Sequence, residues 1–279
     1  MTGNWIVGIL SVILDIWNRG IDEVWSLLTE NPETFKGGSI WGIVLNINGA
    51  LQAIGYSLLI LFFAMSVFKS AGGFRDFKRP ESAIRLLIPF VAAKTAITYG
   101  VEIMTAIFKI CGGIVSRIGG GFGGINAHLS LPNEIVEAIE GVGFMTSIPL
   151  FLVVVLGVGL IAALAFKMIL TVYSRFFRIY MYTALAPIPL AAFGGEVTSG
   201  TGKAFIKSYI GVCFEGAIVI LACIIYNAYA ASTAPGLIDP GTSEIAIVIT
   251  YLAETVFSLL VLVGLVSGAD RLVKEMTAL

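Results

Sequence analysis

The chain is poor in charge. Only 13% of its 279 residues are Asp, Glu, Lys or Arg, whereas 57% are hydrophobic. A soluble domain of ordinary composition has about 25% charged residues. The formal net charge of -1 leaves no clustered basic surface of the kind that holds a nucleic acid backbone, so DNA binding is not predicted. The composition is typical of a protein whose main solvent is lipid.

Cysteine and histidine are also scarce. The three cysteines, Cys111, Cys213 and Cys223, form no Cys-x-x-Cys pair, and an odd number cannot pair completely within one chain. We interpret them as small core residues. His128, the single histidine, has no second histidine or cysteine nearby, so the spacing of a metal site is missing. No metal and no cofactor are expected.

One short segment has part of a phosphate-binding loop. Residues 200–203 read Gly-Thr-Gly-Lys, but Val197 stands where the first glycine is required, and Ala204 stands where Ser or Thr is required. The apolar segments contain neither a nucleophile with its base nor a set of metal ligands. The sequence therefore predicts a protein without catalytic activity.

Long apolar runs dominate what is present. A helix needs about 20 mostly apolar residues to cross a membrane, and five runs qualify. They cover residues 40–68, 83–110, 148–173, 209–231 and 245–266. A shorter run, 184–193, contains Pro187 and Pro189, so we expect a short re-entrant or surface segment there. The predicted fold is all-α, that of a polytopic integral membrane protein.

The distribution of Lys and Arg predicts the orientation, because these residues are retained on the cytoplasmic side of the cell membrane. With five crossings, twelve basic residues fall on one side and four on the other, while Lys94 stays inside a helix. We expect the N-terminus outside and the C-terminus in the cytoplasm. Residues 1–38 are then an external segment, residues 39–268 the transmembrane domain and residues 269–279 a cytoplasmic tail.

The first thirty residues have a different pattern. Ile6, Leu10 and Ile13 recur at helical spacing, while Asp15 and Arg19 occupy other faces. This pattern predicts an amphipathic helix that lies on the external surface of the membrane. A short first crossing is the alternative, and the two charged residues argue against it because they limit the apolar run.

Polar side chains inside the predicted crossings are candidate functional residues. A charge at the centre of a membrane helix costs about 2.5 to 3.5 kcal/mol, so these groups are expected to face protein or water. A water-lined path or a subunit interface is the functional interpretation, and buried pairs that fix helix packing are the alternative. The candidates are Lys94, Thr98 and Glu102 in one crossing, Asn48 and Gln52 in another, and Glu215 and Glu254 in the last two.

Several segments resemble one protein family. The strongest is 180–211, where the sequence Ala-Pro-Ile-Pro-Leu, with Pro187 and Pro189, follows a basic aromatic helix that carries Arg175 and Arg178. Weaker matches are residues 27–32, 54–56, 78–81 and 93–94. Together they resemble the TrbL-like family of type IV secretion membrane proteins, in the small form encoded by conjugative elements of Gram-positive bacteria.

The resemblance implies a non-catalytic scaffold and channel component of a conjugative transfer machine in the cytoplasmic membrane. It also implies a homo-oligomer that assembles with other secretion subunits and their ATPases, and that takes part in the transfer of DNA or protein. The residues themselves leave an alternative, a stand-alone secondary transporter. In that case Lys94, Glu102, Glu215 and Glu254 would couple ions to a solute.

The predicted topology can be tested at residue 236. A cysteine introduced at Gly236 should react with a membrane-impermeant thiol reagent added to intact cells, because the loop at 232–244 has no Lys or Arg and is expected outside. Labelling is measured on a chain whose three native cysteines are replaced. Protection of this cysteine in intact cells, with labelling restored after lysis, would contradict five crossings.

Overall fold

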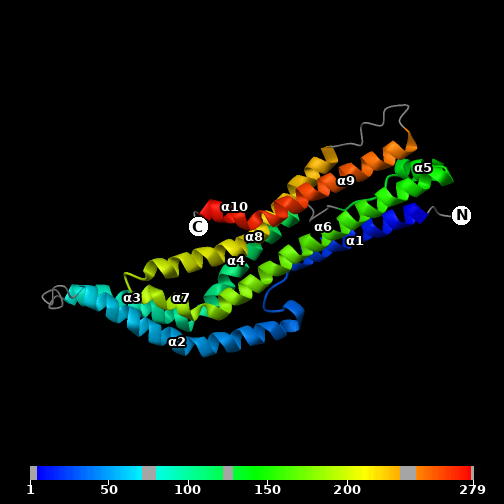
Figure 1. Ribbon diagram of the computed structural model, residues 1–279. Coiled ribbons are helices and arrows are strands. Elements are labelled where there is room, and N and C mark those ends of the chain that lie inside the picture. The colour runs from blue at the N-terminus through cyan, green and yellow to red at the C-terminus, as the bar shows by residue number, and fades with distance from the viewer. Residues whose placement is uncertain (1–4, 71–79, 122–127, 233–242, 278–279) are drawn as a thin grey trace. The chain divides into compact units, whose positions relative to one another are not determined.

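A computed structural model describes residues 5–70, 80–121, 128–232 and 243–277, and all regular structure in these ranges is helical (Figure 1). The predicted external loop around Gly236 lies outside the described residues, as does part of the basic segment at 69–85. The helices in chain order are α1 (Trp5–Thr29), η1 (Phe35–Gly38), α2 (Ser39–Ser70), α3 (Pro80–Thr98), α4 (Gly100–Gly121), α5 (Asn133–Gly141), α6 (Phe144–Leu185), α7 (Pro187–Ala191), η4 (Ala192–Gly194), α8 (Ser199–Ser232), α9 (Glu244–Ser267) and α10 (Ala269–Thr277).

The helical lengths confirm an all-α polytopic membrane protein. Within the described ranges, four helical stretches are long and apolar enough to cross a membrane: Phe35–Lys69, Ser147–Leu185, Ser199–Tyr229 and Glu244–Ser267. They coincide with four of the five predicted crossings. The other predicted crossing, 83–110, is divided between α3 and α4 at Tyr99, although backbone hydrogen bonds continue on both sides of this residue.

The chain forms two compact units. Unit 1 contains Met1–Thr29, Val115–Tyr173 and Ala217–Ala269, and unit 2 contains Glu30–Ile114, Ser174–Gly216 and Asp270–Leu279. Each unit therefore combines segments that are far apart in the sequence, and α4, α6 and α8 each contribute to both.

In unit 1, α1 follows the first part of α6 in the same direction. The rings of Trp5 and Phe151 are 4.4 Å apart between centroids, and Tyr173 Oη donates a 3.0 Å hydrogen bond to Glu23. Between these ends, Gly20 lies close to the Ile169 side chain. The apolar face predicted for α1 is buried, including Ile6, Leu10 and Ile13.

This alignment bears on the predicted position of α1. A helix lying flat on the membrane would cross an upright helix at one point, whereas α1 keeps contact with α6 from residue 151 to residue 173. The packing therefore favours the alternative, a first helix that stands beside α6 at the same depth. The charges of Asp15 and Arg19 are compatible with it, because they pair with each other at 2.8 Å on the exposed face.

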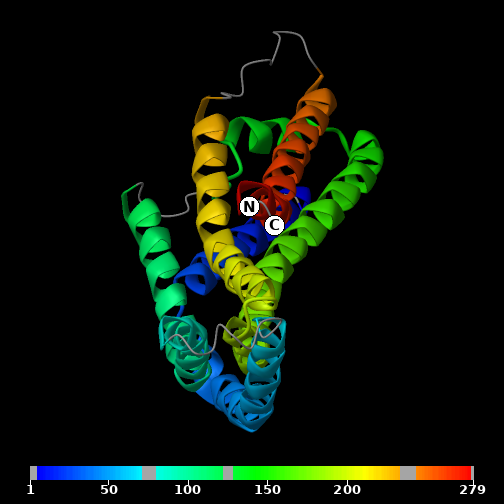
Figure 2. The same ribbon diagram turned by 90° about the vertical axis from the view of Figure 1, so that its left-hand side faces the viewer.

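In unit 2, the proline segment runs parallel to α2 rather than meeting one end of it. Its first contact joins Asn48 to Thr183, and its last joins Ser66 to Glu196. Eighteen residues of α-helix separate Asn48 from Ser66, a length of about 27 Å. Within this length the short helices α7 and η4 both pack against α2 and α3 (Figures 1 and 2). The core of unit 2 forms around this contact and includes Leu59, Ile97, Leu190 and Tyr209.

Two segments that the basic-residue count places on opposite sides of the membrane lie together. Tyr180 Oη donates a 2.9 Å hydrogen bond to the Pro32 carbonyl oxygen, and the rings of Phe35 and Phe176 stack with centroids 4.6 Å apart. Segments in contact share one depth, so the packing favours one side of the membrane for residues 32–35 and 176–180. The sequence-based orientation stays a prediction.

The helix α6 is longer than one crossing needs. It has 42 residues, a length of about 63 Å, which is about twice the thickness of the hydrocarbon core. The predicted crossing 148–173 covers the part that packs with α1, and residues 174–185 contact the start of α2. The spans 148–173 and 40–68 stay predictions.

The turn between α1 and α2 has a left-handed backbone. Lys36, Gly37 and Gly38 have φ values of 50°, 76° and 76°. Glycine adopts this conformation without steric cost, whereas a side chain rarely does. The turn directly precedes Ser39, where α2 begins.

The close approach of α2 to α7 depends on Gly55. A methyl group at this position would lie 2.8 Å from the carbonyl oxygen of Pro187, whereas nothing lies within 4 Å of the same position at Gly49. Gly55→Ala should therefore lower the thermal stability of the purified protein, because backbone atoms have to move apart. Gly49→Ala on the same helix should leave stability unchanged or raise it by up to about 1 kcal/mol, the gain in helix propensity. Equal melting temperatures for the two variants would contradict this contact.

Candidate functional site

The helix break after α6 leaves a carbonyl group without its usual donor. In a continuous helix the Thr183 carbonyl would accept from the backbone N–H of residue 187, but Pro187 has none. Asn48 of α2 supplies the missing donor: its Nδ2 lies 2.7 Å from the Thr183 oxygen, and both side chains are buried. In an apolar environment an unpaired carbonyl is costly, so Asn48 stabilises the break. Pro189, the second proline of the segment, is half-buried in α7.

Two further polar contacts connect α2 to its neighbours. The Gln52 amide lies 3.5 Å from the Asn48 side-chain oxygen. The Thr98 hydroxyl donates to the Lys94 carbonyl, which leaves it free to accept the 2.9 Å hydrogen bond from Tyr56. Thus Asn48, Gln52 and Thr98 are used in helix packing, as the packing interpretation of the polar residues predicts.

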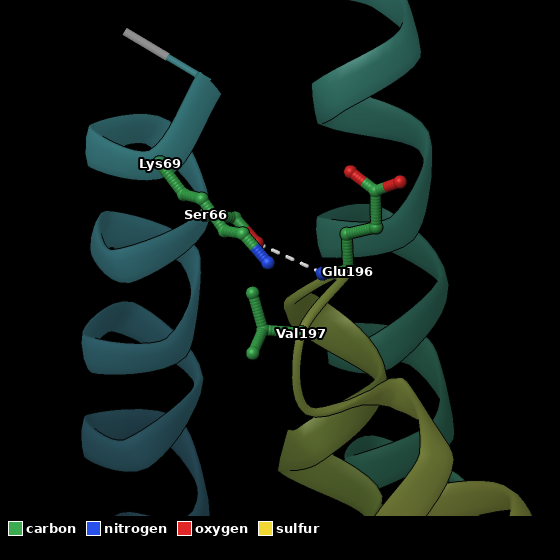
Figure 3. A pocket seen from close by; sticks show the side chains of 4 residues that line it. All are labelled: Ser66, Lys69, Glu196 and Val197. Atoms are coloured by element: carbon green, nitrogen blue, oxygen red, sulfur yellow. Dashed lines mark hydrogen bonds between the residues drawn. The ribbon is translucent and has the colours of Figure 1, made fainter. Parts of the chain in front are cut away.

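The C-terminal end of α2 contacts the segment that follows η4. Ser66 Oγ accepts a 2.8 Å hydrogen bond from the Glu196 backbone N–H, beside a polar pocket of about 280 Å³ that Lys69 and Val197 also line (Figure 3). The carboxylate of Glu196 points away from Lys69 (Figure 3). Both ends of the proline segment are therefore held on α2 by hydrogen bonds.

Arg175 is fully buried between α6, α8 and α4. Its Nε donates to the Val212 carbonyl at 3.1 Å and its Nη2 to the Cys213 carbonyl at 2.9 Å. The guanidinium also lies 5.8 Å from the centre of the Phe108 ring, a cation–π contact. Gly216 makes room for it, since a methyl group there would lie 2.7 Å from the guanidinium carbon. Arg175 thus joins three helices through contacts to backbone and ring.

Arg178, one turn later, joins α6 to α8 and α10. It forms ion pairs with the buried Glu215 and, at 2.9 Å, with Asp270. Asp270 is also bonded by Lys274 at 2.8 Å. Partial burial acts to raise the pKa of Asp270, but these hydrogen bonds and the charge of Arg178 outweigh it and hold the pKa below its ordinary value. Glu215, predicted as an isolated acid, is therefore part of a charge network at the C-terminal helix.

A groove lies between the start of α2 and α4. It has a volume of about 370 Å³ and contains Glu33 and Lys109, whose side chains pair at 3.6 Å. Glu102 is exposed in this groove and forms no ion pair with any residue in the described ranges. The remaining lining residues are Trp41, Leu45, Val101, Thr105 and Ala106.

Two further charges predicted as functional are exposed. Lys94 lies on the outer side of α3, and Glu254 on the outer side of α9. Neither has an ion-pair partner among residues 5–70, 80–121, 128–232 and 243–277. The sequence analysis named eleven residues as candidates for function or for the family resemblance. Ten of them lie in unit 2, and Glu254 lies in unit 1.

Some contacts could not be read from the sequence. Cys111 and Cys213 lie in the same buried cluster although they are 102 positions apart along the chain. Arg175 lies in an aromatic and basic stretch that is typical of membrane-boundary anchors, yet it is buried. The sequence signal for its burial is Gly216, the small residue that the guanidinium requires.

The Asn48 contact predicts a coupling between two substitutions. Asn48→Leu should destabilise the protein by about 0.5 to 1.5 kcal/mol, the net contribution of one hydrogen bond, because the Thr183 carbonyl keeps a longer, 3.4 Å hydrogen bond from the Ala186 N–H. In a Pro187→Ala background the helix can supply its own N–H to Thr183, so the same substitution should cost less. Thermal unfolding in detergent of the four chains in this cycle measures the coupling.

Gln52→Leu is the matched control, because Gln52 lies one turn from Asn48 and makes no hydrogen bond to Thr183. Its effect should be the same with and without Pro187. An equal cost of Asn48→Leu in both backgrounds would contradict the role of Asn48 at the break.

Comparison with known proteins agrees with this architecture. The family model described as TrbL/VirB6 plasmid conjugal transfer like protein matches residues 17–187, more than half of the chain. The match includes α2, the proline break at Pro187 and the buried Arg175. No curated protein and no solved structure was found to match. The chain belongs to the TrbL/VirB6 family of plasmid conjugal transfer-like proteins, which are membrane components of type IV secretion.

Proposed function

We propose that this protein is a non-catalytic scaffold and channel subunit of a type IV secretion machine for conjugative transfer. It works in the cytoplasmic membrane as a homo-oligomer, together with other secretion subunits and the ATPases that drive them. The transferred DNA or protein passes through or beside the assembly. Family membership supports a place in the type IV secretion machine. The polar residues of unit 2 support the scaffold and channel role within that machine.

The observation that carries the proposal is the exposure of Lys94 and Glu102. Both lie on helices with long apolar faces: Ile88 and Val91 are exposed on α3, and Ile110 is exposed on α4. An exposed charge in such a setting is costly when it faces acyl chains. It is stable when water or another protein covers it, which is the situation in a channel or at a subunit interface.

The contacts in unit 2 support the proposed orientation, with the C-terminus in the cytoplasm. Lys69 and Val197 line one pocket, and Lys207 donates to the Thr277 carbonyl at 3.0 Å. The first contact brings Lys69 beside the segment that leads into α8, and the second joins the basic start of α8 to the end of α10. A cytoplasmic position for these basic ends agrees with the retention of Lys and Arg on that side of the membrane.

A secondary transporter is the second candidate, and the broken helix favours it. Transporters of this kind often bind ions at unwound backbone carbonyls beside a helix break. Here, however, the Thr183 carbonyl is occupied by Asn48. This carbonyl is therefore used in helix packing rather than in ion binding. The scaffold and channel role is better supported than the transporter role.

Neutral variants of the two exposed charges separate these functions. Lys94→Gln with Glu102→Gln should reduce conjugative transfer at least about tenfold, which corresponds to a loss of roughly 1.4 kcal/mol at the interface or path. Mating frequency and the size of the assembly on native gels are the measurements. Solute flux into liposomes that contain the purified protein should stay at background for the original chain and the variant alike.

Exposed charges elsewhere provide the control. Glu137→Gln on α5 with Lys203→Gln on α8 removes one charge of each sign and should leave transfer unchanged. Robust solute transport by the purified protein, lost in the Lys94 and Glu102 variant, would reverse the ranking in favour of a transporter.

A further inference from the structure

The groove at the start of α2 has the chemistry of a lipid headgroup site. Lys109 and Glu102 stand seven residues apart on α4, which places them on one helix face about 10 Å apart along the axis. Thr105 and Ala106 lie between them, and Trp41 forms part of the opposite wall. A positive group, a hydroxyl and a carboxylate therefore follow one another along a single groove.

The position of the groove along the helices fits a membrane boundary. The neighbouring turn at residues 30–38 contains Glu30, Asn31, Glu33 and Lys36 between two apolar helices. Such a concentration of polar groups next to a tryptophan is typical of the headgroup region. This argument holds for either face of the membrane and does not depend on the channel role.

The charges select one class of lipid. The groove contains the carboxylates of Glu33 and Glu102 but only one ammonium, that of Lys109. Lys109 already forms an ion pair with Glu33. The groove is therefore net negative, which disfavours an anionic headgroup. A zwitterionic headgroup with a primary ammonium matches it, since its phosphate can reach Lys109 and the Thr105 hydroxyl while its ammonium donates hydrogen bonds to Glu102.

We propose that this groove binds a phospholipid with a primary ammonium, of the phosphatidylethanolamine class, at the boundary of the membrane. Lys109 and Thr105 hold the phosphate, Glu102 holds the ammonium, and Leu45 with Val101 forms the apolar wall. A bound lipid compensates the charge of Glu102 within the groove.

The lipids that stay bound to the purified protein test this proposal. The purified protein is incubated with an equal mixture of phosphatidylethanolamine, phosphatidylcholine and phosphatidylglycerol, and bound lipids are counted by native mass spectrometry. The original chain should retain phosphatidylethanolamine at least severalfold above the other two. Glu102→Gln should remove this preference, and Lys109→Gln should weaken retention of all three.

Matched controls are Glu137→Gln and Lys203→Gln, exposed residues away from the groove, which should keep the preference. Each variant is first checked for helical content and a single elution peak. An unchanged preference in Glu102→Gln, or a preference for phosphatidylglycerol, overturns the proposal. So does an Ala106→Cys variant that forms disulfide-linked dimers in membranes, because a second copy of the chain would then cover the groove.

The single variant Lys94→Gln separates the two proposals, because Lys94 does not line the groove. It should reduce transfer and keep the preference for phosphatidylethanolamine. An unchanged lipid preference in Glu102→Gln overturns the lipid site alone, whereas normal transfer in Lys94→Gln counts against the channel role alone.

Discussion

The hydrogen bond from Asn48 to the Thr183 carbonyl is the interaction on which unit 2 depends. It exists because Pro187 takes a backbone donor out of the helix at a buried position. The backbone offers this acceptor the Ala186 N–H at a long 3.4 Å, and a side-chain donor from a neighbouring helix completes its hydrogen bonding in the absence of water. This need brings α2 to the end of α6. The proline segment then follows α2, packs on α3 and ends at Ser66.

Two charged residues of α6 stabilise unit 2 through contacts with α8 and α10. Arg175 reaches the carbonyls of α8, and Arg178 connects α8 and α10 through Glu215 and Asp270. These contacts hold α6, α8 and α10 in fixed positions within unit 2.

The sequence predicted much of this fold because length and hydropathy are local properties. Four of the predicted crossings coincide with long apolar helices, and the two prolines located the break. The partners across helices were not predictable, since a donor such as Asn48 gives no sign of which carbonyl it will meet. The depth of a crossing is likewise set by partners. Apolar length shows that a segment can cross, whereas a contact such as that of Phe35 with Phe176 shows that two segments share a depth.

The helical register of α2 has a consequence for how this chain can change over time. Asn48 meets Thr183 and Gly55 meets Pro187 from the same helix. One residue added or removed between Asn48 and Gly55 would turn these two positions by about 100° relative to each other and change their spacing by about 1.5 Å. The two contacts could then not form together. The number of residues between Asn48 and Gly55 is therefore constrained more strongly than the side chains that lie between them.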